Sequence, residues 1–442
     1  MASVRFDPVG PLGGSLRPPS DKSISHRAAI LAAMGEGETS IEGYLDSADT
    51  RATLAAIAAV GARVEGNGER LLIEGVGLRG AAPAAIDVGN AGTLMRLLPG
   101  WLAAQPGGEW TLDGDESIRR RPIDRIVEPL RLMGADVTAR DQRLPPLTVR
   151  GSALHGIEYR LPVASAQVKS CLLLAGMLAE GETTVVEPAP TRDHTERMLA
   201  SARADVSVEP AGTPVTLRGR LPGNRIRVRT AERLEPGRFA VPADFSSAAF
   251  SLAAAVLVPG SDVTVTGVGL NPTRIGFLGI LNRMGAAIEV TEHAPAGGEP
   301  RGSILARHGP DLEAVRVGAG EVPLAIDELP LLGLLGCFAD GDTRVSGAEE
   351  LRYKESDRIA TVVEGLRALG AEIEASDDGF SVKGTGHLRG GVLDARGDHR
   401  LAMMGAVAGL ASEEGVEVRG FDAAGVSYPG FERDLRALAD VA

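Results

Sequence analysis

One sequence pattern recurs six times along the 442 residues and constrains the fold more than any other feature. Each copy has an apolar run, a glycine turn, a short strand and an amphipathic helix, and the sixth copy is truncated. The turns lie roughly 70–80 residues apart, which is one supersecondary unit per repeat. The alternation of strands and helices predicts an α/β fold. The turn glycines are Gly35, Gly107, Gly181, Gly260, Gly341 and Gly415.

The apolar run of each repeat predicts a buried helix, and polar residues precede every one of them. Most of these beginnings offer Asp, Ser or Asn as a helix cap. Because a helix N-terminus carries unpaired N–H groups and a partial positive charge, each beginning is a candidate anion site. The six beginnings read SDKSISHR, GNAGTLMR, ASAQVKS, PADFSSA, AIDELP and GDHR.

The charge distribution is uneven. The chain has 46 Lys and Arg against 59 Asp and Glu, and this net charge of −13 disfavours nucleic-acid binding. Cations nevertheless recur at helix beginnings, in DKSISHR, IRRRPID, KESDR and GDHR. Each segment alone also fits a solvated helix end or a surface ion pair. Together they predict a cleft that binds a polyanionic small molecule, or two anions.

Other features narrow the class of protein. The two cysteines, Cys171 and Cys337, lie in apolar runs, which indicates packing residues in a reduced, cytoplasmic protein. We expect no secretory segment, no membrane span and no metal site, since the histidines are scattered. Asp327 lies between apolar residues, where a carboxylate is costly unless it has a role.

At these motifs the sequence resembles the 5-enolpyruvylshikimate-3-phosphate synthase family, the 3-phosphoshikimate 1-carboxyvinyltransferases. DKSISHR, GNAGTLMR, RPI, SAQVKS, TRDHT, KESDR and GDHR match the family in order over essentially the whole chain. The resemblance implies two similar domains, each of three βαβαββ repeats around buried parallel helices, as an inside-out α/β barrel. Residues 1–20 and 241–442 would form one domain and residues 21–240 the other, with the active site in the cleft between them.

The resemblance also implies the reaction. The enolpyruvyl group of phosphoenolpyruvate would move to the 5-hydroxyl of shikimate 3-phosphate by addition and elimination through a tetrahedral intermediate, with release of phosphate. This is a step of the shikimate pathway of aromatic amino acid biosynthesis, and a target of glyphosate. The family implies no cofactor, no metal, no nucleic-acid or membrane partner, and a monomer.

Site residues follow from the resemblance, position by position. Asp327 would be the base, Glu355 the other candidate acid or base, and Lys22 a proton donor or relay. The residues implied for shikimate 3-phosphate are Lys22, Ser23, Arg27, Ser165, Ala166, Gln167, Arg192, Asp327 and Lys354. Those implied for phosphoenolpyruvate are Lys22, Asn90, Gly92, Arg121, Gln167, Arg358 and Arg400.

The sequence departs from the family at two points and leaves two alternatives. Leu97 replaces a frequent proline, and the AGVSYPGFE stretch lacks a lysine found in some members. Gly92 is the small residue usual in glyphosate-sensitive members. The alternatives are a UDP-N-acetylglucosamine enolpyruvyl transferase, which would need a cysteine that residues 89–122 lack, and a non-catalytic anion-binding protein of the same fold.

Overall fold

The computed structural model describes residues 2–211, 223–309 and 311–440. The chain divides into two compact units. Unit 1 comprises Met1–Pro19, Pro242–Ala294 and Pro300–Ala442, and unit 2 comprises Ser20–Val241 and Pro295–Glu299. Residues 295–299 thus belong to unit 2, whereas the sequence predicted them to belong to the domain formed by residues 1–20 and 241–442.

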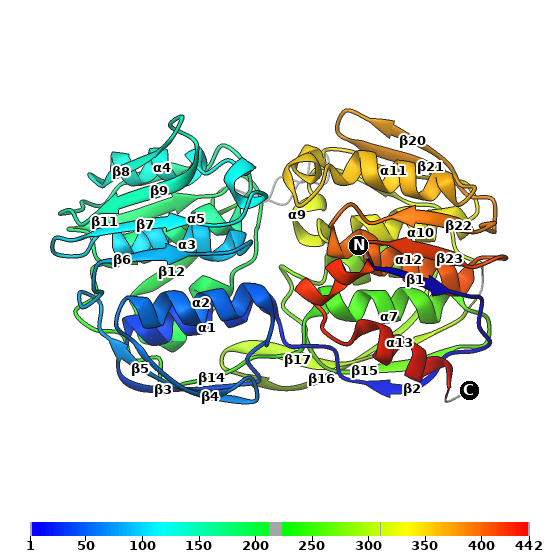
Figure 1. Ribbon diagram of the computed structural model, residues 1–442, viewed down its shortest axis with the longest axis horizontal. Helices are drawn as coiled ribbons and strands as arrows, with labels where there is room; N and C mark the ends of the chain where they lie inside the picture. Colours follow the sequence, from blue (N-terminus) through cyan, green and yellow to red (C-terminus); the bar gives the residue numbers. More distant parts are fainter. Residues whose placement is uncertain (1, 212–222, 310, 441–442) are drawn as a thin grey trace. The chain divides into compact units, whose positions relative to one another are not determined.

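Six sheets follow one pairing scheme, which is the structural form of the six repeats (Figure 1). In each, an edge strand pairs parallel with a central strand, and the central strand pairs antiparallel with the next. The sheets of unit 2 are β14(Arg238–Ala240)-β3(Glu36–Glu42)-β5(Arg70–Val76)-β4(Arg63–Asn67), β6(Ala84–Asp87)-β7(Glu109–Asp113)-β9(Leu144–Arg150)-β8(Asp136–Arg140) and β10(Glu158–Arg160)-β11(Glu182–Val186)-β13(Asn224–Arg229)-β12(Val206–Pro210).

Unit 1 repeats the scheme with a shorter third sheet. Its sheets are β2(Gly13–Leu16)-β15(Asp262–Gly269)-β17(Glu299–Arg307)-β16(Ala287–Ala296), β18(Arg316–Val317)-β19(Asp342–Val345)-β21(Gly379–Lys383)-β20(Glu372–Ser376) and β22(Gly391–Asp394)-β23(Val416–Arg419)-β1(Ser3–Phe6). In the last sheet, β1 from the start of the chain occupies the antiparallel position beside β23. The truncated sixth repeat is thus completed by a remote strand.

Two edge strands are exchanged between repeats. β2 directly precedes the first inner helix in sequence, yet it pairs with β15 in register Val263↔Gly14. β14 likewise precedes the inner helix that begins at Phe245, yet it pairs with β3 in register Phe239↔Ile41. Local sequence order therefore misplaces both strands, because parallel partners are chosen by tertiary contacts.

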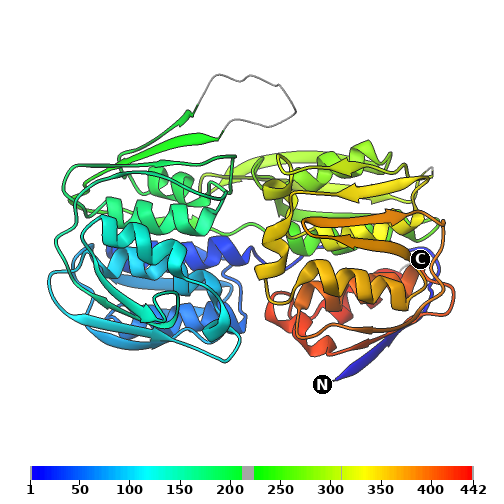
Figure 2. The ribbon, with the colours of Figure 1, turned by 90° about the horizontal axis from the view of Figure 1, so that it is seen from above.

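Six inner helices form the centres of the two cores. They are α1(Lys22–Met34), α3(Gly92–Leu102) and α5(Ala166–Gly176) in unit 2, and α7(Phe245–Leu257), α10(Leu329–Phe338) and α12(His399–Ala411) in unit 1. Apolar residues cover every face of these helices, so they are buried all round, and within each unit they run in roughly the same direction (Figures 1 and 2). Their N-terminal ends in one unit therefore lie at the same end of its core.

The outer helices are amphipathic and pack against the sheets. They are α2(Ala48–Ala59), α4(Asp124–Leu132), α6(His194–Ser201), α8(Gly276–Arg283), α11(Arg358–Ala368) and α13(Phe431–Ala439). Short helical turns complete the repeats as η1(Ile118–Arg120), α9(Val322–Ala325), η2(Glu349–Tyr353) and η3(Phe421–Val426). No helix in the described ranges is long and apolar enough to cross a membrane.

Side-chain caps begin most of the inner helices, as the sequence predicts. Asp21, Ser165, Asp244 and Asp398 each accept a hydrogen bond from a backbone N–H of the first turn. α3 and α10 have no such side-chain cap. The N–H groups that begin these two helices are therefore not engaged by a side chain of their N-cap residue.

The turn glycine of the first repeat, Gly35, ends α1 as expected but differs from the other five in backbone conformation. Gly107, Gly181, Gly260, Gly341 and Gly415 all have positive φ, between 76° and 95°. In the first repeat, however, Gly37 takes this conformation with φ 79°, while Gly35 has φ −74°. Gly35 is needed for space instead, because a Cβ there would lie 2.6 Å from Cδ of Pro236.

Candidate functional site

In unit 2, the predicted residues around the start of α3 come together. Gln167 at the start of α5 donates from Nε2 to Oγ1 of Thr93 at 3.1 Å. Arg121 donates from Nη2 to Oδ1 of Asn90 at 2.8 Å. These bonds place an amide, a guanidinium and an uncapped helix N-terminus side by side, which is a suitable arrangement for an anion.

Gly92 is the first residue of α3 and leaves room beside two guanidiniums. A Cβ at this position would lie 3.0 Å from Nη1 of Arg96 and 3.2 Å from Nη1 of Arg121. Both distances are tighter than ordinary contacts of a Cβ atom. Glycine therefore keeps the space in front of these arginines open.

Lys22, the first residue of α1, has a carboxylate partner that the sequence did not reveal. Its Nζ lies 3.0 Å from Oδ2 of Asp49 on α2, and the lysine side chain is 22% exposed. The sequence grouped Lys22 with Ser23 and Arg27 and did not predict this contact. A half-buried ion pair of this kind fixes the position of the ammonium group.

Arg27 is buried, and all three nitrogens of its guanidinium group donate hydrogen bonds within the protein. Its Nε donates to Oγ1 of Thr195 at 2.7 Å, and its Nη2 donates to Oγ of Ser170 at 2.9 Å. Its Nη1 donates to the carbonyl of Ser23 at 3.0 Å. Burial lowers the pKa of Arg27 to about 10, with Glu196 opposing the shift, so the side chain stays protonated at neutral pH.

The helix α5 beneath this network is held by a buried ion triad. Nζ of Lys169 lies 2.9 Å from Oε2 of Glu187 and 2.7 Å from Oε1 of Glu196. Burial acts to lower the pKa of Lys169, but the two carboxylates outweigh it and leave this pKa raised. Lys169 is only 1% exposed, and both carboxylates engage its ammonium group.

Three further predicted residues of unit 2 lie at the same helix ends and are half-buried. Ser165 accepts at its Oγ from the N–H of Val168 at 3.4 Å and so caps α5. Ala166 is the first residue of that helix, and its carbonyl accepts from Oγ of Ser170 at 2.7 Å. Arg192 lies near Arg27, whose pKa it helps to lower.

In unit 1, Arg358 is the centre of a buried charge cluster. It donates from Nε to Oδ2 of Asp398 at 2.8 Å and from Nη2 to Oδ1 at 3.2 Å. It also bonds Oε2 of Glu355 at 2.7 Å and Oδ1 of Asp327 at 3.2 Å. Burial opposes the charge of Arg358, but the surrounding carboxylates raise its pKa further above the ordinary value.

Asp327 lies among three guanidiniums from three different elements. Besides Arg358, its Oδ2 is 3.5 Å from Nη1 of Arg274 and 3.9 Å from Nη2 of Arg400. The Asp327 side chain is 14% exposed, whereas that of Asp398 is 0% exposed. Within this cluster Asp327 is therefore a carboxylate that a ligand could reach.

Lys354 is half-buried and lies close to the same carboxylate. Burial lowers the pKa of Lys354, Asp327 opposes this shift, and Arg358 adds to it. The structure thus brings Asp327, Lys354, Glu355, Arg358 and Arg400 into one group in unit 1.

Sequence reasoning missed four participants in these groups. Asp49 gave no distinctive signal, since it is a common polar residue at the start of an outer helix, whereas Thr195 is the last residue of the TRDHT motif. Arg274 and Glu328 did have one, because they belong to the motifs NPTR and AIDELP that precede helices. Their burial, at 5% and 0% exposure, is what marks them as cluster members.

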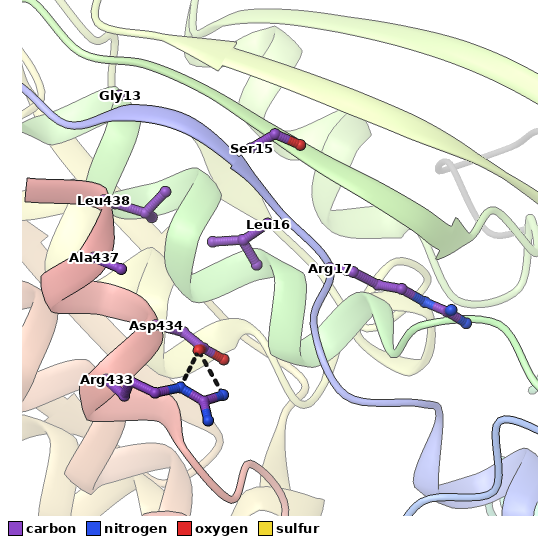
Figure 3. Close-up of a pocket in the computed structure, with 8 residues that line it drawn as sticks. All are labelled: Gly13, Ser15, Leu16, Arg17, Arg433, Asp434, Ala437 and Leu438. Carbon is purple, nitrogen blue, oxygen red and sulfur yellow. Dashed lines mark hydrogen bonds and ion pairs between the residues drawn. The ribbon is translucent and has the colours of Figure 1, made fainter. Parts of the chain in front are cut away.

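A separate pocket of about 320 Å³ lies between β2 and α13 in unit 1. It is lined by Gly13, Ser15, Leu16, Arg17, Arg433, Asp434, Ala437 and Leu438, which include no predicted site residue. Figure 3 shows that Arg433 is bonded to Asp434, at 2.8 Å from Nη2 to Oδ1. This pocket does not contribute to the candidate site.

Comparisons with known proteins agree with this geometry. Residues 6–435 match the family model described as EPSP synthase (3-phosphoshikimate 1-carboxyvinyltransferase). The chain belongs to the EPSP synthase family. The 3-phosphoshikimate 1-carboxyvinyltransferase of Methylococcus capsulatus is 47% identical over 435 residues, covering 98% of this chain and 96% of the relative. The Thermus thermophilus protein of the same name is 47% identical over 440 residues, covering 99% of each.

A solved EPSP synthase, from Acinetobacter baumannii, has the same fold. It superposes with a TM-score of 0.85 at 40% identity, covering 100% of this chain and 98% of the other. The expected α/β enolpyruvyl transferase fold is thereby confirmed. Membership of the EPSP synthase family makes the protein a transferase of aromatic amino acid biosynthesis, and neither alternative from the sequence is favoured.

The buried side chain of His26 should make the stability of the protein depend on pH. It is buried, its Nδ1 lies 2.6 Å from Oγ1 of Thr53, and burial lowers its pKa from 6.5 to about 3, with Asp49 opposing. The folded state therefore binds fewer protons than the unfolded state between these values. We expect the free energy of unfolding to fall with decreasing pH, by up to about 1.4 kcal/mol per pH unit below the unfolded pKa.

Urea denaturation over a series of mildly acidic pH values checks this. His26→Gln should lose this part of the slope, while the control His387→Gln, at an exposed turn, should keep it. An identical pH dependence of stability in His26→Gln and the wild type would contradict the assignment.

Proposed function

We propose that the enzyme transfers the enolpyruvyl group of phosphoenolpyruvate to the 5-hydroxyl of shikimate 3-phosphate and releases phosphate. The observation that carries the proposal is the group of buried arginines around Asp327, a carboxylate that is partly accessible. A reaction between two anions that also moves protons needs this combination of fixed cations and a carboxylate.

We assign shikimate 3-phosphate to Lys22, Ser23, Arg27, Ser165, Ala166, Gln167, Arg192, Asp327 and Lys354. In unit 2 the assignment is supported by the half-buried side chains of Lys22, Ser23 and Ser165 at the starts of α1 and α5. Arg27 is fixed by Thr195 and Ser170, so little side-chain entropy remains to be lost when it meets an anion.

We assign phosphoenolpyruvate to Lys22, Asn90, Gly92, Arg121, Gln167, Arg358 and Arg400. Support comes from the bond between Arg121 and Asn90 and from the open space at Gly92. Arginines suit this substrate because each guanidinium can donate two parallel hydrogen bonds to a phosphate or carboxylate.

The chemistry assigns a role to each titratable group. The 5-hydroxyl loses its proton to Asp327 as its oxygen attacks C2 of phosphoenolpyruvate, and C3 gains a proton from Lys22 or Glu355. In the elimination C3 returns a proton, the C2–O bond to phosphate breaks, and phosphate leaves. Arg358 and Arg400 stay charged and stabilise the phosphate of the tetrahedral intermediate.

The proposal includes the setting of the enzyme. The reaction requires no metal or organic cofactor, and we propose that the enzyme acts as a monomer in the cytoplasm. The buried, unpaired thiols of Cys171 and Cys337 suit a reducing compartment, and burial raises the pKa of each to about 12.

A phosphate-release assay with the purified enzyme tests the function directly. Phosphate should appear only when phosphoenolpyruvate and shikimate 3-phosphate are both present. Release with UDP-N-acetylglucosamine in place of shikimate 3-phosphate would favour the first alternative. A folded enzyme that releases no phosphate with either acceptor would overturn the proposal.

Asp327→Asn tests the base assignment. The amide keeps the size of the side chain but cannot accept the hydroxyl proton, so kcat should fall by about 10²–10⁴-fold. The control Asp340→Asn removes an exposed carboxylate from the same unit and should leave kcat unaltered. If Asp327→Asn keeps most of the turnover, Asp327 is not the base.

Gly92→Ala tests the space in front of Arg121. The added methyl group crowds two guanidiniums, so the inhibition constant of glyphosate should rise by about tenfold or more, as an overpacking cost of about 1–3 kcal/mol implies. Gly279→Ala is the control, because its Cβ would meet nothing within 4 Å. An unchanged inhibition constant in Gly92→Ala would exclude the steric explanation.

A further inference from the structure

The cluster proposed to bind an anion in unit 1 contains more carboxyl groups than guanidiniums. Ion pairs join the guanidiniums of Arg274, Arg358 and Arg400 to the carboxyl groups of Asp244, Asp327, Glu328, Glu355 and Asp398. Lys354 adds one further cation nearby. If all five carboxyl groups are ionised, the cluster is net negative and repels an incoming anion.

Four of these five carboxyl groups have close donors that stabilise their ionised form. Asp244 accepts from Arg274 at 3.0 Å and from the N–H of Ser246 at 3.0 Å. Asp398 accepts from Arg358 and also from Oγ of Ser356 at 3.0 Å. Asp327 and Glu355 bond Arg358 at 3.2 Å and 2.7 Å. Donors at these distances compensate the burial of each of the four carboxyl groups.

Glu328 differs from the other four. Its only hydrogen-bond donor among the described residues is Oγ of Ser246, which contacts Oε1. The nearest guanidinium nitrogens, Nη1 of Arg274 and Nη1 of Arg400, are 3.7 Å and 3.8 Å from Oε1, beyond hydrogen-bond range. Its Oε2 is buried and has no hydrogen-bond partner there, and the residue is 0% exposed.

Charged groups face Glu328 from each element packed around it. Asp244 and Ser246 lie at the start of α7, and Arg274 precedes α8. Arg400 lies on α12, where Asp398 and His399 are its neighbours, and Asp327 precedes Glu328 in the chain. Arg358 on α11 reaches the group through Asp327.

We propose that Glu328 is a positioning residue that takes up a proton when phosphoenolpyruvate binds, and that its neutral form lets Arg400 turn its charge toward this anion. The inference rests on the proposed function, since it assigns Arg400 to phosphoenolpyruvate. The proton comes from solvent and joins Oε1 or Oε2, so the cluster loses one negative charge as the ligand brings its own.

The environment of Glu328 supports this assignment. Burial raises the pKa of Glu328 above its usual value, Arg274 and Arg400 oppose the shift, and Asp327 adds to it. An anion bound to Arg400 partly neutralises its positive charge. Arg400 then stabilises ionised Glu328 less, and protonation of Glu328 becomes more favourable. By linkage, binding of phosphoenolpyruvate must then weaken as the pH rises through the pKa of Glu328 in the free enzyme.

Calorimetry of a dead-end complex measures the proton directly. The enzyme is saturated with a shikimate 3-phosphate analogue that lacks the 5-hydroxyl, so no reaction follows, and it is titrated with phosphoenolpyruvate at a series of pH values that spans the titration of Glu328. Repeating the titration in buffers of different ionisation enthalpy gives the number of protons taken up. We expect about one proton for the wild type and close to zero for Glu328→Gln.

Kinetics provide an independent measurement and a second variant. Above the pKa of Glu328 in the free enzyme, the wild-type KM for phosphoenolpyruvate should rise by up to about tenfold per pH unit, whereas that of Glu328→Gln should stay flat. Ser246→Ala removes the hydrogen-bond donor that stabilises the ionised form of Glu328. The KM of this variant for phosphoenolpyruvate should therefore begin to rise at a higher pH than that of the wild type. Glu321→Gln is the matched control, because Glu321 pairs with Arg283 outside the cluster and should follow the wild type.

The outcomes separate this inference from the proposed function. Normal phosphate release together with equal proton uptake in the wild type and Glu328→Gln would overturn the role of Glu328 alone. A Glu328→Gln enzyme whose KM for phosphoenolpyruvate rises with pH as in the wild type would also overturn it. Absence of phosphate release from the wild type would instead refute the proposed function.

Discussion

The bidentate pair between Arg358 and Asp398 is the interaction on which the rest of unit 1 depends. Asp398 caps α12 and accepts from the N–H of Arg400, while Arg358 begins α11. One carboxylate thus fixes the starts of two helices and the backbone of a second arginine. Removing one partner of such a buried pair costs about 3–5 kcal/mol, because the other charge is left without compensation.

In unit 2 a buried polar network with fewer charged groups connects the helices. Lys169 joins α5 to Glu187 and to Glu196 on α6, and the neighbouring Thr195 and Ser170 hold Arg27 on α1. Three helices are therefore locked by one polar network that is almost fully buried. A network of this kind is stable only when its members are satisfied, and it fixes one arrangement of the helix ends.

Both units place functional groups at the ends of helices that are otherwise apolar. Burying each inner helix supplies stability through its apolar surface, and it leaves only the polar first turn for chemistry. Absence of a side-chain cap on α3 and α10 follows the same division, since a cap would occupy the N–H groups that an anion can use. Stability and binding are thus assigned to different parts of one helix.

The sequence by itself determined the repeat, the buried helices, the caps and the family, because periodicity, apolar runs and ordered motifs are local properties. It did not show that Gly37 rather than Gly35 takes the positive φ of the other five turns, or that Gly35 packs against Pro236. Only the tertiary structure decided that β2 and β14 exchange sheets and that Asp49 faces Lys22. It alone distinguished Glu328 from Asp327, adjacent in sequence, because their hydrogen-bond donors, Ser246 and Arg358, are remote in the chain.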